Sequence, residues 1–193
     1  MQQPTRSARR YWYRGPRQAG SAMDLRQVSE RVRVVLDYAQ EVEAHTVGFH
    51  RVTDINAVAN HAARHNKNLN MHEYIAEMAE SVGAEMVVAQ YLGFKNFKPT
   101  LNTFKNEADV GTRFEVKWTK YKDGHLAIGE TDRQQDVAIL VVGKSPVYEI
   151  AGWIPVQMAR KPKYLHQAYG CHWIPQNNLF PIQDIRNSIY GTD

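Results

Sequence analysis

The feature that most constrains the fold is a run of six apolar residues, Val137-Ala-Ile-Leu-Val-Val142. A strand with one face in water alternates apolar and polar residues, whereas a strand covered on both faces reads as a continuous apolar run. The run therefore predicts a central strand with other elements packed on both of its faces. Gly143-Lys-Ser-Pro146 predicts a turn directly after it, and Val147 to Ile154 predicts a further strand.

Two helices are predicted before this strand. Asp37 is suited to be the N-cap of a helix that starts near Ala39. The segment from about Met71 to Leu92 has apolar residues at helical spacing, and Gly93 after it is suited to end the helix.

The predicted fold class is α/β (α+β), with a mixed central sheet of about four or five strands flanked by helices. Asp123-Gly124 predicts a hairpin, with His125 to Ile128 as its returning strand. Pro155 to about Arg160 predicts a short helix, and the segment after it predicts an irregular apolar tail that packs onto the body.

The positive charge of the chain is concentrated at its N-terminus. Of 24 basic residues, five arginines lie in residues 1–22, which contain no acidic residue. The other 19 basic residues face 20 acidic ones, so the remainder has a net charge of about −1 with histidine neutral. We expect residues 1–22 to form a basic arm or leader, native or translated upstream of a start at Met23, and residues 23–193 to form one domain.

Several function classes are disfavoured by composition. No apolar run approaches the length of a membrane span, and no signal peptide is visible, so we expect a cytoplasmic protein. The single cysteine, Cys171, excludes an intrachain disulfide and a cysteine-based zinc site. His61 and His65 have the spacing of two ligands on one helix face, but no third ligand follows in a zinc arrangement.

The chemistry-bearing segment is Asp109-Val-Gly-Thr-Arg-Phe-Glu-Val-Lys117. Its second half is predicted to be a strand, in which Glu115 and Lys117 share one face and Phe114 and Val116 the other. Two carboxylates on rigid elements can hold Mg²⁺, and a nearby lysine can stabilise the charge of an attacked phosphate. The alternative is an ordinary ion pair on a strand face.

A third acid lies in the predicted helix from Met71 to Leu92. At 100° per residue Glu85 falls on the shoulder of the apolar stripe, at the edge of the core. It is therefore either half of a partly buried salt bridge or a carboxylate directed at Asp109 and Glu115.

This order of features resembles the PD-(D/E)XK nuclease superfamily, whose members share a restriction-endonuclease-like core. The chain is also similar to small phage-encoded proteins over roughly residues 28–182. The segments that carry this similarity are Gly83–Gly93, Asn102–Lys105, Asp109–Gly111, Glu115–Lys117, Asp132-Arg133, Leu140–Gly143 and Gly152–Ile154.

The resemblance implies a role for each residue of the site. Asp109 and Glu115 would bind Mg²⁺ or Mn²⁺, with the backbone carbonyl of Val116 as a further ligand. Lys117 would position the attacking water, and Glu85 would be the helical acid directed at the metal or its water. Three basic residues would contact the substrate, namely Arg133, Lys105 and Arg113.

The resemblance thus implies a metal-dependent nuclease, expected to be a deoxyribonuclease and an endonuclease, with DNA as partner and a homodimer as one possible assembly. One alternative is a nucleic-acid-binding or virion-associated protein that keeps the fold without turnover, which the near-neutral body favours. Another is a structural module whose partner surface includes Trp153 and Trp173 as exposed aromatics.

Overall fold

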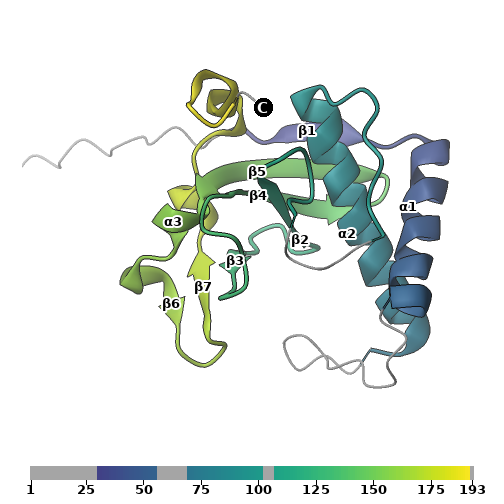
Figure 1. Cartoon of the computed structure of the whole chain (residues 1–193), viewed down its shortest axis with the longest axis horizontal. Coiled ribbons are helices and arrows are strands. Elements are labelled where there is room, and N and C mark those ends of the chain that lie inside the picture. Colours follow the sequence, from purple (N-terminus) through teal and green to yellow (C-terminus); the bar gives the residue numbers. More distant parts are fainter. Residues whose placement is uncertain (1–29, 56–68, 102–106, 192–193) are drawn as a thin grey trace, which may run out of the picture.

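The computed structural model describes residues 30–55, 69–101 and 107–191, which form a mixed α+β fold (Figure 1). The helices, including π-helical and 3-10 segments, are α1 (Tyr38–His50), η1 (Arg51–Ile55), α2 (Met71–Leu92), α3 (Val156–Ala159), η3 (Pro162–Tyr164), η4 (Gln176–Asn178) and η5 (Ile182–Asn187). The strands are β1 (Val32–Val35), β2 (Phe114–Thr119), β3 (Leu126–Ile128), β4 (Val137–Lys144), β5 (Val147–Pro155), β6 (Leu165–His166) and β7 (Cys171–Ile174).

The main sheet has four strands in the order β1-β5-β4-β2. β2 runs parallel to β4, while β5 is antiparallel to both β4 and β1, so the sheet is mixed as predicted. β4 is an inner strand, and all six residues of its apolar run are buried. The strand predicted from that run is therefore confirmed.

A second sheet, in the order β3-β7-β6, was not predicted from the sequence. β3 pairs with β7 and not with β2, so the predicted hairpin around Asp123-Gly124 is wrong. The outer edge of β2 is instead used by the residues just before it. Val110 forms a bridge with Phe114, and the Asp109 carboxylate accepts a hydrogen bond from the Val116 N–H.

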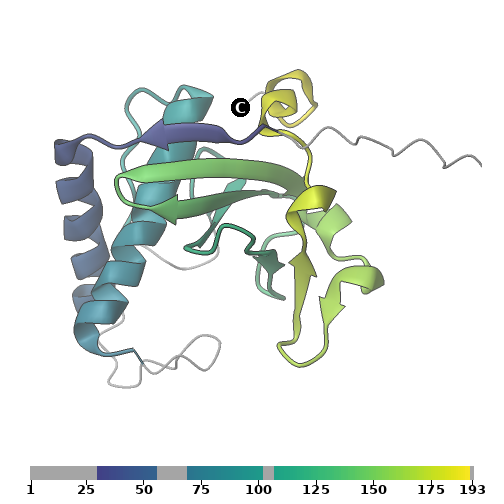
Figure 2. The ribbon, with the colours of Figure 1, turned by 180° about the vertical axis from the view of Figure 1, so that it is seen from behind.

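Each face of the main sheet has its own apolar core. One core lies between the sheet and the long helices: α2 crosses the sheet, and α1 lies beside α2 (Figures 1 and 2). The other core joins Ala138 and Leu140 of β4 to β3, β7 and α3. The irregular tail predicted after α3 is thus partly a sheet, which covers the second face of β4.

The caps predicted at Asp37, for the start of α1, and at Gly93, for the end of α2, are confirmed. Asp37 and Gln40 form a capping box at the start of α1, and Asn70 and Glu73 form one at the start of α2. Gly93 ends α2 in the left-handed conformation, with φ 92°. None of the described helices is both long and apolar enough to cross a bilayer.

The packing of α1 on α2 depends on Gly48. A β-carbon at this position would lie 2.7 Å from the backbone nitrogen of Ala79 and 2.8 Å from its Cα. Both atoms belong to the backbone of α2, so they cannot yield without moving the helix.

Gly48→Ala is therefore expected to lower the free energy of unfolding by about 1–3 kcal/mol, because the added methyl group overpacks the helix contact. This loss opposes the intrinsic helix propensity, which favours alanine over glycine by about 1 kcal/mol. Urea unfolding measures this change. Thr46→Ala, at an exposed position of the same helix, is the control and should leave stability nearly unchanged. A more stable Gly48→Ala protein would contradict the close helix contact.

Candidate functional site

The alternation predicted for β2 is confirmed. Phe114 and Val116 are buried in the core beneath α2, while Glu115 and Lys117 share the other face. Lys117 Nζ lies 2.7 Å from Glu115 Oε1. The Glu115 side chain is only 2 % exposed, so this is not an ordinary ion pair on a solvated strand face.

Lys117 contacts a second buried carboxylate, that of Asp132, in the segment between β3 and β4. Its Nζ lies 2.8 Å from Asp132 Oδ1, while Asp132 Oδ2 accepts a hydrogen bond from the Gly129 N–H. Burial alone lowers the pKa of Lys117, but Glu115 and Asp132 outweigh that effect and raise the pKa above its ordinary value. Lys117 is therefore a cation at neutral pH and not a general base.

Asp109 reaches the same strand through a tight turn. Gly111 has φ 59°, and Val110 and Phe114 exchange two backbone hydrogen bonds across the turn. The Asp109 carboxylate then accepts a hydrogen bond of 2.8 Å from the Val116 N–H. Because the N–H and C=O of one strand residue point to the same side, the Val116 carbonyl faces this edge too.

Glu85 of α2 is buried and paired with Arg51 at the end of α1. The two guanidinium nitrogens lie 2.7 and 2.8 Å from the two carboxylate oxygens. Burial raises the pKa of Glu85 to about 7; Arg51 opposes the rise, and Asp109 and Glu115 add to it. The salt bridge expected for Glu85 is therefore confirmed, and Glu85 also lies within electrostatic reach of Asp109 and Glu115.

Arg133 and Asp136 form the last pair of the cluster. Arg133 Nε and Nη2 donate to the two Asp136 oxygens at 2.8 and 2.7 Å, and Nη2 also donates to the Thr112 carbonyl. The hydrogen bonds to Asp136 are the main cause of the raised pKa of Arg133. The negative charges of Glu115 and Asp109 raise this pKa further. Arg133 is thus electrostatically coupled to the acids that the sequence placed in the site.

The cluster combines buried carboxylates with buried or half-buried cations. In the described part of the chain, every charged residue that is fully buried belongs to it, namely Arg51, Glu85, Glu115, Asp132 and Asp136. Half-buried Asp109, Lys117 and Arg133 adjoin these residues. A divalent cation at Asp109 and Glu115 would add positive charge beside these carboxylates.

The residues fit Mg²⁺ better than a metal that needs several protein ligands. Among the described residues, no group of three or more His, Cys, Asp and Glu side chains is close enough to hold a metal ion. Mg²⁺ is commonly bound through one or two carboxylates, with water and substrate phosphate completing the octahedron. Asp109 and Glu115 can supply such a pair.

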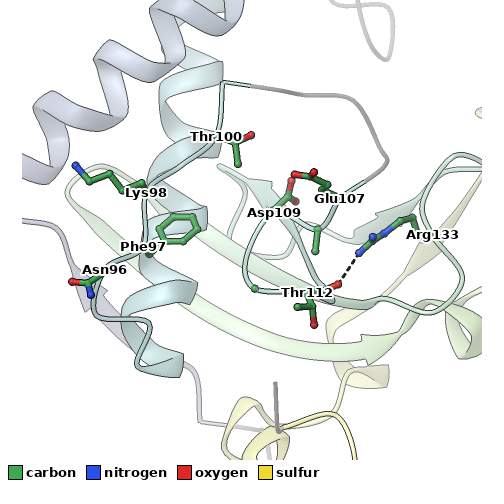
Figure 3. A pocket seen from close by; sticks show the side chains of 10 residues that line it. Asn96, Phe97, Lys98, Thr100, Glu107, Asp109, Thr112 and Arg133 are labelled. Carbon is green, nitrogen blue, oxygen red and sulfur yellow. Dashed lines mark hydrogen bonds between the residues drawn. The ribbon is translucent and has the colours of Figure 1, made fainter.

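A cleft of about 460 Å³ opens beside Asp109 (Figure 3). Asp109 and Glu107 lie between Thr100 and Arg133, whereas the Lys98 side chain points away from them. The cleft lining is completed by Asn96, Phe97, Ala108, Gly111 and Thr112. The cleft therefore gives a ligand access to one carboxylate of the cluster and to Arg133.

The other predicted residues have different outcomes. Arg113 is half-buried directly before β2 and is not among the described residues that line the cleft. Lys105, the arm 1–22 and the pair His61 and His65 lie outside the described residues. Trp153 is 4 % exposed, so it cannot be part of an exposed aromatic surface, because it is packed beneath Phe180 and Tyr190.

Arg51, Asp132 and Asp136 are the members of the cluster that sequence reasoning did not assign to the site. Arg51 is 34 positions from Glu85, and the two meet only because α1 packs on α2. Asp132 lies 15 positions from Lys117, after a strand that was expected to pair elsewhere. Asp136 gave one local signal, as an acid directly before the central strand, but such an acid is too common to single out a site.

Comparisons with protein-family models, with curated proteins and with solved structures found no match to this chain.

The Arg51–Glu85 pair allows a test of the buried cluster. Arg51→Met should destabilise the protein by about 3–5 kcal/mol because it leaves a buried carboxylate uncompensated. The loss should be smaller at about pH 5 than at about pH 8. A carboxyl group whose pKa is raised by folding favours the folded state at low pH. That contribution to stability disappears as the pH rises through the pKa of the group in the folded protein, which is about 7 for Glu85 when Arg51 is present.

Urea unfolding of Arg51→Met, Glu85→Leu and the double variant measures the coupling. The double variant should recover most of the stability lost in Arg51→Met, because both charges are then removed. Additive effects of the two single changes would contradict a direct buried pair.

Proposed function

We propose that this protein is a Mg²⁺- or Mn²⁺-dependent nuclease of the PD-(D/E)XK superfamily, with a restriction-endonuclease-like core, that hydrolyses phosphodiester bonds in DNA. The observation that carries the proposal is the gathering of Asp109, Glu115 and Lys117 along β2, in a cluster of buried charges beside a cleft. Burying carboxylates is costly, so their accumulation beside a cleft supports a bound divalent cation.

Asp109 and Glu115 would hold the metal, with the Val116 carbonyl as a further ligand at the same edge and Glu85 close enough to orient a metal-bound water. When bound, Mg²⁺ supplies a coordinated water of lowered pKa and a positive charge next to the phosphate. Arg51 holds the Glu85 carboxylate in place through two hydrogen bonds. Glu85 would therefore form a hydrogen bond to that water from a constant position.

Lys117 would stabilise the negative charge that develops on the attacked phosphate. Its raised pKa keeps it an ammonium group, which can donate hydrogen bonds but cannot accept a proton. Glu115 and Asp132 together fix the position of Nζ. A cation held in advance in this way does not need to reorganise during the reaction.

Arg133 would contact the phosphate that enters the cleft. Asp136 and the Thr112 carbonyl hold its guanidinium group, and its side chain is directed toward Asp109 (Figure 3). Arginine is well suited to phosphate because its planar group presents several donors in a fixed geometry.

The alternative is a nucleic-acid-binding protein that retains this fold without turnover. It is favoured by the pairing of four buried carboxylates with protein cations, through Lys117, Arg51 and Arg133. In that case the cluster would be structural, and a raised carboxyl pKa, as at Glu85, would reduce its negative charge by protonation.

Metal binding separates these functions without an activity assay. Mg²⁺ at about 100 times its dissociation constant should stabilise the protein by about 2.7 kcal/mol, which corresponds to a rise in Tm of about 5–10 °C. Thermal unfolding with Mg²⁺, and with EDTA as reference, measures the shift. Asp109→Asn should abolish it, whereas Asp123→Asn, at an exposed position between β2 and β3, should not.

Cleavage tests the reaction itself. Plasmid, linear, single-stranded and branched DNA should be cut only with Mg²⁺ or Mn²⁺, and Lys117→Met should lower the rate by about 100-fold or more. Lys120→Met is the matched control, because Lys120 is exposed at the end of the same strand. Metal-dependent cutting that survives Lys117→Met, in a protein with an unchanged circular dichroism spectrum, would refute the assigned site.

A further inference from the structure

The small sheet carries an aromatic cluster that the proposed reaction does not use. His166, Tyr169 and Trp173 lie around the β6–β7 hairpin, with ring centroids 4.6–5.1 Å apart, and Tyr169 stacks on Trp173 at an interplanar angle of 9°. His125, directly before β3, lies 5.6 Å from Trp173. We call these four residues the aromatic platform.

The aromatic platform faces solvent. Tyr169 is 47 % exposed, His125 is exposed, and His166 and Trp173 are half-buried. The hairpin that carries three of the four rings projects from the end of the main sheet that lies away from α1 (Figures 1 and 2). In the described part of the chain, moreover, His166 Nδ1 is the one buried side-chain nitrogen or oxygen without a hydrogen-bond partner.

The segment that carries three of the four rings is positively charged. Residues 150–183 contain no aspartate or glutamate, and their basic residues Arg160, Lys161 and Lys163 lie together from the end of α3 into η3. Lys163 Nζ lies 4.6 Å from the ring centroid of Tyr164, so charge and aromatic surface alternate here. The fourth ring, His125, is instead close in sequence to the exposed acids Asp123 and Glu130.

One residue links the aromatic platform to the candidate site. Arg160 donates to the backbone carbonyls of Gly129, Glu130 and Asp132 and so holds the segment that presents Asp132 to Lys117. Lys161 follows Arg160 directly. A strand bound along Lys161 and Lys163 would therefore lie next to the segment that completes the Lys117 site.

We infer that the aromatic platform and the adjoining lysines bind a single-stranded segment of nucleic acid, with an unpaired base stacked on the exposed ring of Tyr169, which Trp173 supports from beneath, and phosphates on Lys161 and Lys163. Aromatic rings can stack on a base only when that base is unpaired, and lysines contact phosphates regardless of sequence. The inference rests on the proposed function, for which it specifies a substrate with a single-stranded region.

Binding in EDTA tests the inference without turnover. The probes are fluorescein-labelled dT20, a 20-residue strand without bases, a blunt 20-base-pair duplex and rU20, compared by fluorescence anisotropy. The unsubstituted protein should bind dT20 at least about 5-fold more tightly than the strand without bases, because each stacked base contributes about 1–3 kcal/mol. It should also prefer dT20 to the duplex; the rU20 affinity then tells whether the 2′-hydroxyl is tolerated.

The variants separate stacking from charge. Tyr169→Leu should remove most of the preference for dT20 over the strand without bases, whereas Tyr38→Leu, at a position 81 % exposed on α1, should not. Lys161→Gln with Lys163→Gln should weaken both strands equally and reduce the salt dependence of log K by about 0.7 per lost phosphate contact. Lys144→Gln, exposed at the end of β4, is the control for charge.

Equal affinity of the unsubstituted protein for dT20 and the strand without bases would overturn the inference, as would identical effects of Tyr169→Leu and Tyr38→Leu. These results are independent of the nuclease proposal. Ring-dependent binding without cleavage would refute only the nuclease, and cleavage without ring-dependent binding would refute only the aromatic platform.

Discussion

The candidate site depends on a single buried carboxylate, that of Glu115. Its side chain is 2 % exposed, and its charge influences the pKa of Glu85, Lys117, Arg133 and Asp136. A charge buried to this extent is tolerated only when cations or a metal ion compensate it. The arrangement of the surrounding pairs can be understood as the means by which the fold accommodates this one group.

The fold brings the compensating cations from three separate parts of the chain. Arg51 comes from the residue directly after α1, Lys117 from β2, and Arg133 from the segment before β4 on the cleft side. β4 makes this convergence possible, because it is covered on both faces and pairs with β2 in parallel. The parallel pairing places the start of β2 beside the start of β4, and hence Glu115 near Asp136.

The structure divides the molecule into two parts with different chemistry. Buried charges gather along β2 beside a cleft, with Glu115 and Lys117 on the face of the main sheet opposite the long helices. On that same face, the small sheet carries aromatic rings and lysines without acids between Glu149 and Asp184. An acidic centre suits a metal ion and a basic aromatic surface suits a nucleic-acid strand, so the two parts are compatible with one substrate.

The sequence by itself determined the elements whose signals are local. The apolar run of β4, the caps of α1 and α2, and the alternation of Glu115 and Lys117 all depend on neighbouring residues, and all are confirmed. Only the tertiary structure decided which partners those elements meet. The pairing of β3 with β7, the burial of Trp153 and the contacts of Arg51 and Asp132 join residues far apart in the chain. Such contacts depend on which surfaces pack together, and local residue patterns do not specify that choice.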